Sequence, residues 1–263
     1  MKIEVDSLCQ GYGKDDVLKN ITFSSNEGEM LALLGPNGSG KSTLIKTLCN
    51  IMEPRSGTVC IDGKNLYDME LTDIAKIISY VPQSGMASVY TKVIDTVLIG
   101  RRPHVGWTYS EKDIDIAIES MQAMKVESLS DRNTAELSGG QKQRVYMARS
   151  LAQSPSFFML DEPTSALDLR HQMNMMVTMR KLIEERDVGV IVALHDINLA
   201  LNYSDRVMMI KDGEIYAIGE PESTITEENI NEVYGVEAEI VTSKNGGRYL
   251  LPLSPRNNSN DDF

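Results

Sequence analysis

The chain has 263 residues, of which 41% are hydrophobic and 24% are charged, and its formal net charge is −12. That length allows one large α/β domain with a buried core, and the acidic charge argues against a general nucleic-acid binder, which needs clustered Lys and Arg. Three cysteines without paired or metal-ligand spacing fit a reducing compartment.

The N-terminus resembles a strand rather than a targeting signal, because apolar and charged residues alternate over residues 3–6. The longest apolar runs, 30–34 and 190–194, are far shorter than the ~20 residues that a membrane-spanning helix needs. A membrane role would therefore require a partner protein that spans the bilayer.

The first part of the chain is predicted to consist of strands and one helix. The strand patterns are residues 2–6 and 21–25 as an antiparallel edge, 30–34 as a buried central strand, and 58–61 between turns at 56–57 and 62–63. A helix is predicted to begin near Lys41, because Leu44, Leu48 and Ile51 recur at helical spacing.

Residues 84–155 have helical patterns, with Ile114, Ile118, Met121 and Met124 on one face. Further along, strands alternate with a polar helix, which predicts a parallel α/β core. The predicted elements are strands at 157–160, 188–194 and 206–210, a helix at 169–187, hairpin turns at 211–214 and 245–247, and a polar tail at 257–262.

A glycine-rich segment, residues 35–42, lies between a predicted strand and a predicted helix, as the P-loop pattern requires. It consists of Gly35, Pro36, Asn37, Gly38, Ser39, Gly40, Lys41 and Ser42. Its backbone N–H groups and the helix end would stabilise an anion. We predict that Lys41 reaches the terminal phosphates of ATP, that Ser42 ligates Mg²⁺ and that Thr43 lies near the α-phosphate. The alternative is a glycine turn that only caps a helix.

Two adjacent carboxylates, Asp161 and Glu162, end the apolar run 157–160. Ligands bind at the carboxyl edge of a parallel sheet. We predict that Asp161 holds magnesium, directly or through water, and that Glu162 is the general base for the attacking water. Alone, the pattern also fits a strand that simply enters a turn.

A second glycine motif precedes a helical face formed by Val145, Ala148 and Leu151. The motif consists of Leu137, Ser138, Gly139, Gly140 and Gln141. Its glycines would lie at a helix N-terminus, which is a second anion-binding end. One chain with two such ends predicts a homodimer, in which the helix end of one subunit closes on ATP held by the P-loop of the other.

Together these motifs, the run 165–168 and His195 resemble the ABC ATPase family in content, order and spacing, over nearly the whole chain. The resemblance implies an α/β fold with a P-loop NTPase, RecA-like core, an antiparallel β edge subdomain and an inserted helical subdomain. We expect a single domain over 1–263, with the core at 1–83 and 156–234, the helical subdomain at 84–155, and a small C-terminal hairpin and tail at 235–263.

The resemblance also implies roles for single residues. Tyr12 looks like the adenine-stacking aromatic, and Gln83 like the glutamine that contacts magnesium and senses the transmembrane partner. His195 looks like the switch histidine on the γ-phosphate, which joins Lys41 and Glu162 as a catalytic residue. Asp168 would cross the dimer interface and help set the opposing site. Taken alone, Tyr12, Gln83 and His195 would be an ordinary strand residue, a loop residue and a hydrogen-bonded histidine.

A narrower resemblance lies in the runs 100–104, 168–172, 234–236 and 246–248, which look like importer ATPases for ferric siderophores, haem or cobalamin. It implies the motor of an ABC importer, peripheral on the cytoplasmic face of the cell membrane. Its cofactors would be ATP and Mg²⁺. Its partners would be transmembrane permease subunits, a second copy and, indirectly, an extracytoplasmic solute-binding protein, with no nucleic acid.

Three alternatives remain open at this stage. The chain could be a soluble ABC ATPase acting on DNA or ribosomes, a transporter motor for an unrelated solute, or a nucleotide-binding regulator that does not hydrolyse ATP. The run 85–89, where the family docks its membrane partner, has no recognisable motif. The sequence therefore leaves the identity of the permease open.

Overall fold

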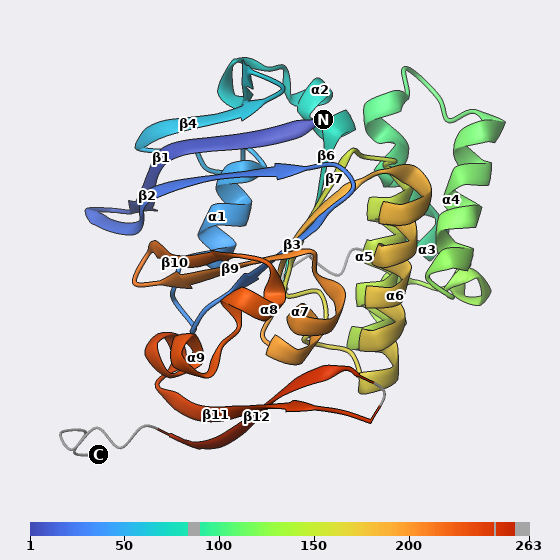
Figure 1. Cartoon of the computed structure of the whole chain (residues 1–263). Coiled ribbons are helices and arrows are strands. Elements are labelled where there is room, and N and C mark those ends of the chain that lie inside the picture. The colour runs from blue at the N-terminus through green and yellow to red at the C-terminus, as the bar shows by residue number, and fades with distance from the viewer. Residues whose placement is uncertain (84–89, 245, 256–263) are drawn as a thin grey trace.

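The computed structural model describes residues 1–83, 90–244 and 246–255 (Figure 1). Its centre is a six-stranded sheet with the strand order β10-β9-β3-β8-β7-β6. These strands are β3 (Met30–Leu34), β6 (Ile78–Val81), β7 (Phe157–Asp161), β8 (Gly189–Ala193), β9 (Arg206–Lys211) and β10 (Glu214–Gly219). All neighbours pair in parallel except β9 and β10. The predicted parallel core is confirmed.

The central strands are apolar without alternation because both faces of the sheet are covered. Every residue of β3, β7 and β8 is buried. Alternate residues of β3 enter two different cores, one shared with α1 (Lys41–Leu48) and the other with α5 (Gly139–Ala152) and α6 (Leu169–Arg186). Such coverage is typical of parallel sheets. Because both faces of the sheet are covered, polar groups gather at the ends of its strands.

The strands predicted as an antiparallel edge subdomain pair in a sheet of their own, separate from the parallel one. This sheet has the order β2-β1-β4-β5, with β1 (Lys2–Tyr12), β2 (Asp15–Asn26), β4 (Ser56–Ile61) and β5 (Lys64–Asn65). β1 and β2 are longer than predicted because the register shifts between Val5 and Leu8, where Ser7 has a φ of 50°. Bulges of this kind break the alternation from which strands are recognised.

The expected first helix is present, but it ends at Leu48. Asn50 then takes a φ of 55° and turns the chain out of the helix. Ile51 was expected to continue the helical spacing of Leu44 and Leu48, but it lies beyond the helix and is 55% exposed. A short η1 (Leu66–Asp68) and α2 (Leu71–Ile77) lead to β6.

Residues 90–155 are helical, as predicted, and lie to one side of the sheet (Figure 1). The elements are α3 (Val93–Leu98), η2 (Ile99–His104), α4 (Glu111–Ala123), η3 (Glu127–Leu129), η4 (Thr134–Glu136) and α5. On the predicted face, Met121 and Met124 are buried, whereas Ile114, in the first turn of α4, is 41% exposed.

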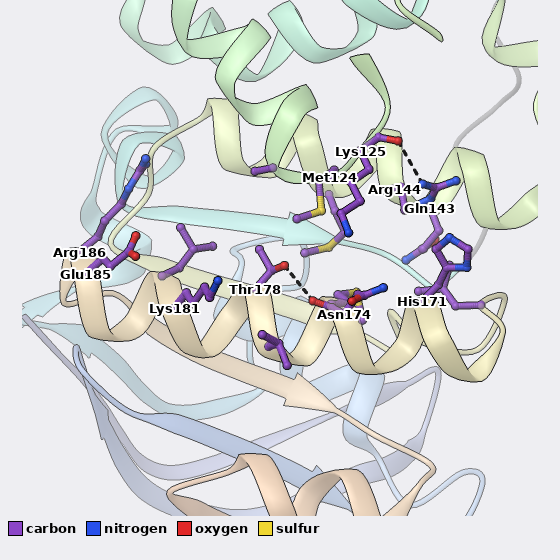
Figure 2. Close-up of a pocket in the computed structure, with 16 residues that line it drawn as sticks. Met124, Lys125, Gln143, Arg144, His171, Asn174, Thr178, Lys181, Glu185 and Arg186 are labelled. Carbon is purple, nitrogen blue, oxygen red and sulfur yellow. Dashed lines mark hydrogen bonds between the residues drawn. The ribbon is translucent and has the colours of Figure 1, made fainter. Parts of the chain in front are cut away.

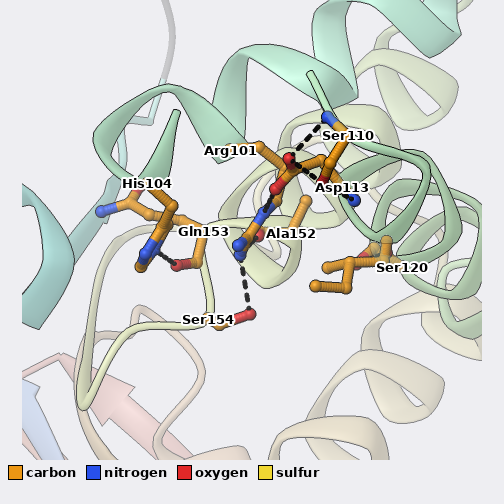
Figure 3. Close-up of polar contacts among 9 residues, drawn as sticks. Arg101, His104, Ser110, Asp113, Ser120, Ala152, Gln153 and Ser154 are labelled. Carbon is orange, nitrogen blue, oxygen red and sulfur yellow. Dashed lines mark hydrogen bonds and ion pairs between the residues drawn. The ribbon is translucent and has the colours of Figure 1, made fainter. Parts of the chain in front are cut away.

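An ion pair between two buried side chains ties η2 to α4 (Figure 3). Arg101 Nε lies 2.9 Å from Asp113 Oδ1, and Arg101 Nη1 donates to the carbonyl of Ala152 at 2.8 Å. Ser110 completes the arrangement, because its N–H and hydroxyl both donate to Asp113 Oδ2. The pair therefore links η2, α4 and the end of α5.

The chain ends with α7 (Ile197–Tyr203), α8 (Pro221–Thr224), α9 (Glu227–Tyr234), β11 (Val236–Thr242) and β12 (Arg248–Pro255). Both predicted hairpins are present, β9–β10 and β11–β12, whereas the predicted tail 257–262 and the run 85–89 lie outside the described residues. Within the described ranges, no helix has both the length and the apolarity to cross a bilayer.

Candidate nucleotide site

The P-loop connects the end of β3 to the start of α1. Gly35 has a φ of 151° and Gly40 a φ of 109°, in the region that favours glycine. A Cβ on Gly35 would lie 2.2 Å from the carbonyl oxygen of Ile210, and a Cβ on Gly40 would lie 2.6 Å from Leu18 Cδ2. The close turn therefore requires glycine at both positions, and the predicted strand–loop–helix arrangement is present.

The loop borders a cavity of about 270 Å³. Tyr12 and Glu162 line it together with the loop, although they are distant in sequence. The lining residues are Tyr12, Val17, Asn37, Gly38, Ser39, Gly40, Lys41, Ser42, Thr43 and Glu162. Tyr12 ends β1 and is about half exposed, so its ring is free to contact a planar ligand.

Lys41 is a buried cation that forms no ion pair with any residue that the structure describes. Its Nζ donates to the carbonyls of Gly35 at 2.7 Å and Pro36 at 3.0 Å. Burial lowers the pKa of Lys41, while the nearby Glu162 and Asp161 carboxylates oppose that shift. A charged ammonium that bonds only to neutral carbonyls at the loop is well placed to bind an anion such as a phosphate.

Asp161 and Ser42 place two oxygen atoms side by side. Ser42 Oγ donates to Asp161 Oδ1 at 2.7 Å, and Asp161 is buried. Burial raises the pKa of Asp161, the Ser42 bond opposes this, and the Glu162 carboxylate adds to it. A hydroxyl and a carboxylate are the hard oxygen ligands that Mg²⁺ prefers, and Mg²⁺ commonly takes its other ligands from phosphates and water. The residues present therefore fit a magnesium ion.

Glu162 joins two residues that the sequence placed in separate motifs. Gln83 Nε2 donates to Glu162 Oε2, and His195 Nε2 lies 2.6 Å from Glu162 Oε1. The backbone N–H of Glu162 donates to the carbonyl oxygen of Ala193 at the end of β8. The backbone φ of Glu162 is 49°. A non-glycine residue in this left-handed region costs roughly 1–2 kcal/mol, and such residues cluster at functional sites. Gln83, Glu162 and His195 thus form one group beside the P-loop.

The second glycine motif begins α5, as predicted. Ser138 is the N-cap: its hydroxyl accepts from the N–H of Gln141 at 3.3 Å, and Gln141 Oε1 accepts from the N–H of Ser138 at 3.0 Å. Ser138 and Gly139 are exposed, and neither Gly140 nor Gln141 lines the P-loop cavity. The two anion-binding ends of one chain therefore do not meet at one cavity.

Asp168 caps α6 and does not line the P-loop cavity either. It accepts from the N–H of His171 at 2.9 Å and lies 2.7 Å from His171 Nδ1, and these bonds lower the pKa of Asp168. Ala166 and Leu167, which precede it, lie against Gly140. Asp168 is therefore grouped with the second glycine motif rather than with the P-loop.

Two residues near the site were not given a role from the sequence. Val17 lines the cavity from β2, and Tyr80 lies on β6 beside Asp161, where burial and then that carboxylate raise the pKa of Tyr80. Their proximity follows from strand pairing between β6 and β7 and from the β1–β2 hairpin. Motif spacing alone carries no signal for either.

A family model described as ABC transporter matches residues 18–165. The chain is 42% identical over 240 residues to an uncharacterised ABC transporter ATP-binding protein of Methanocaldococcus jannaschii, covering 91% of this chain and 94% of that protein. It is 39% identical over 245 residues to a hemin import ATP-binding protein of Gloeobacter violaceus, covering 90% and 89%.

Among solved structures, an inward-facing ABC transporter described as of the metal-chelate type matches with a TM-score of 0.82 and 25% identity, over 97% of this chain and 98% of that one. The fold is that of the ABC ATPase cassette, in agreement with the fold class that the motifs predicted. The chain belongs to the ABC transporter family, as an ATP-binding subunit with ATPase activity.

Proposed function

We propose that this subunit is the motor of an importer for a metal chelate, such as a ferric siderophore, haem or cobalamin. Two similarities support this cargo class: the hemin import protein at 39% identity and the metal-chelate-type transporter with a matching fold. The observation that carries the motor role is the Glu162 carboxylate, held between Gln83 and His195 beside the P-loop cavity.

In this proposal the P-loop binds the phosphates of ATP, with Lys41 at the terminal phosphates and Tyr12 against the adenine. Ser42 and Asp161, joined by Gln83, would hold Mg²⁺, which would neutralise charge on the phosphate oxygens. Glu162 accepts a proton from the attacking water. The water oxygen bonds to the γ-phosphorus as the bond to the bridging β-phosphate oxygen breaks, which leaves ADP and phosphate. His195 orients the γ-phosphate. The contact of both Gln83 and His195 with one carboxylate supports this division of roles, because it positions the base before substrate arrives.

We further propose that two copies bind two ATP molecules head to tail. The exposed N-terminus of α5 supports this, since Ser138, Gly139, Gly140 and Gln141 do not face the cavity of their own chain. In the dimer they would contact ATP on the partner P-loop, and Asp168 would cross the interface. Hydrolysis removes the contacts that hold the dimer closed, and opening moves residues 84–155 against the permease subunits.

The decisive experiment is Glu162→Gln, because the amide keeps the size of the side chain and removes its basicity. We expect ATP hydrolysis to fall about a thousandfold, within the range of general-base contributions, while ATP binding is retained. The variant should accumulate as an ATP-bound dimer. Phosphate release measures the first effect and light scattering with ATP measures the second.

A matched control is Glu184→Gln, which changes an exposed glutamate of α6 that forms no ion pair in the described part of the chain. It should hydrolyse ATP at the wild-type rate. Unchanged turnover in Glu162→Gln would remove the proposed base.

The importer role is tested by what co-purifies with the subunit from native membranes. A transmembrane permease should co-purify, with this subunit bound at its cytoplasmic face. Vesicles that contain both should take up a ferric siderophore, haem or cobalamin only when ATP and the solute-binding protein are present. Recovery with ribosomes or DNA instead would favour the soluble ABC ATPases. Uptake of an unrelated solute would support the proposed motor role and contradict the proposed cargo.

A further inference from the structure

A second cavity, of about 380 Å³, lies between α5 and α6 and reaches the end of α4 (Figure 2). It shares no lining residue with the P-loop cavity. From α6 it is lined at helical spacing by His171, Asn174, Thr178, Leu182 and Glu185. The proposed motor function uses none of these side chains, so this groove needs an explanation of its own.

The floor of the groove is apolar and rich in methionine. Met124, Met147 and Met175 are at most 5% exposed, and Leu182 lies beside them. Methionine side chains are flexible and polarisable, so they adapt their shape to an apolar partner. The volume is within the range of small-molecule sites. The floor therefore suits a slender apolar group.

The rim of the groove is cationic, in contrast to the net charge of −12 for the chain. Four of its lining residues carry positive charge and one, Glu185, carries negative charge. The cations are Lys125, Arg144, Lys181 and Arg186. Within the ranges that the structure describes, none of the four forms an ion pair. The local field therefore favours an anion.

Two neighbouring donors at one end of the groove lack acceptors. Gln143 is 6% exposed, and its Nε2 has no hydrogen-bond partner among the described residues; the same is true of the buried Nε of Arg144. Figure 2 shows both residues at the His171 end of the groove, with Lys181 and Arg186 farther along α6. Because a buried unpaired donor is unfavourable, an acceptor group that reaches this end would be stabilised.

We propose that this groove binds a small anionic amphiphile, with a carboxylate or similar acidic head near Arg144 and Gln143 and an unbranched apolar tail along the methionine floor. The apolar floor would bind the tail of such a molecule. The cations without ion pairs and the donors without acceptors would bind its acidic head. The ligand would contact both α5 and α6, the two helices whose N-caps are Ser138 and Asp168.

The test is calorimetric titration of the full chain, without nucleotide, with sodium decanoate below its micelle concentration. We expect saturable binding of one decanoate per chain and no such binding of decyltrimethylammonium, which has a similar tail and the opposite charge. Because ATP is absent, the outcome does not depend on the proposed motor function.

Three variants locate the site. Arg144→Glu should weaken decanoate binding at least tenfold and Lys181→Glu severalfold. Ala123→Trp, at an exposed lining position, should abolish it by filling the groove. Lys64→Glu is the matched control, since Lys64 is exposed on β5, outside the groove, and should bind like the wild type.

Thermal unfolding of each variant shows whether it is folded. If Arg144→Glu does not fold, the variants at the surface positions Lys181 and Ala123 still test the proposal. Binding without saturation, equal binding of the cationic amphiphile, or wild-type affinity in both Lys181→Glu and Ala123→Trp would overturn the proposal.

Discussion

Among the residues that the structure describes, buried charged side chains occur in two regions, and the two regions differ in which groups these side chains contact. In the helical region, Arg101 and Asp113 meet directly at 2.9 Å (Figure 3). At the P-loop, Lys41 bonds to two carbonyl oxygens, and Asp161 accepts from a hydroxyl. Arg101 and Asp113 form an ion pair with each other, whereas Lys41 and Asp161 form none with any residue that the structure describes.

The pKa shifts of the two aspartates run in opposite directions. The bonds from Ser110, and then Arg101, lower the pKa of Asp113 to about 2, whereas burial raises the pKa of Asp161. A buried charge that lacks a counterion is unfavourable until a ligand supplies one, and strongly perturbed groups in a cleft are candidates for function. The difference therefore distinguishes a structural ion pair from a binding site.

The largest effect that this comparison predicts is for Lys41→Ala. ATP affinity should fall about a thousandfold, equivalent to about 4 kcal/mol, because a desolvated charge contact is lost. Fluorescent-nucleotide titration measures it, and Lys64→Ala on β5 is the control. Since Lys41 forms no ion pair in the described part of the chain, the stability of the nucleotide-free protein should change little. Wild-type affinity in Lys41→Ala would contradict the P-loop role.

Arg101→Ala should show the reverse behaviour. Removing one partner leaves the Asp113 carboxylate buried and unpaired, so the free energy of unfolding should fall by about 3 kcal/mol in urea denaturation. Nucleotide affinity should remain close to that of the wild type. The double variant Arg101→Met/Asp113→Leu should recover much of the loss, because no charge is left unpaired. A double variant as unstable as Arg101→Ala would contradict the account.

A pH series separates the two aspartates further. Because the pKa of Asp113 is depressed from 3.8 to about 2 in the fold, its stabilising contribution is present above pH 3.8 and is lost as the pH falls toward 2. The difference in unfolding free energy between the wild type and Asp113→Asn should therefore shrink by about 1–2 kcal/mol between pH 5 and pH 2. A pH-independent difference would show that the pKa of Asp113 is the same in the folded and the unfolded chain.

Asp161→Asn should give the smallest change, with the opposite sign. A raised carboxyl pKa destabilises the fold increasingly as the pH rises above 3.8. The amide still accepts from Ser42, so the nucleotide-free variant should be slightly more stable than the wild type at pH 7. Thermal unfolding without nucleotide measures this. A lower melting temperature would indicate that the Asp161 charge is compensated.

Much of the site could be predicted from the sequence because its motifs are local. Residues 35–42 and 137–141 each combine a required backbone conformation with a helix start, and a short pattern of glycines and polar residues encodes both. The apolar runs that became β3, β7 and β8 are similarly local. These features need no knowledge of distant contacts.

The contacts between motifs could not be predicted in this way. The bonds of Glu162 to Gln83 and His195 depend on which strands become neighbours, and no periodicity encodes that order. Two local backbone features were also not predicted. A bulge at Ser7 lets β1 continue beyond its predicted end, and a turn at Asn50 ends the helix before Ile51, which is exposed. In each case a single backbone conformation overrode the side-chain pattern.

The strand order has a consequence for synthesis on the ribosome. The P-loop follows β3, Asp161 and Glu162 lie at the end of β7, and His195 follows β8. These strands adjoin in the sheet, although β3 is made early and β8 late. A nascent chain stalled before residue 189 holds the glycine loop yet lacks β8, the strand that pairs with both β3 and β7. Nucleotide capture during translation is therefore confined to the last stretch of elongation.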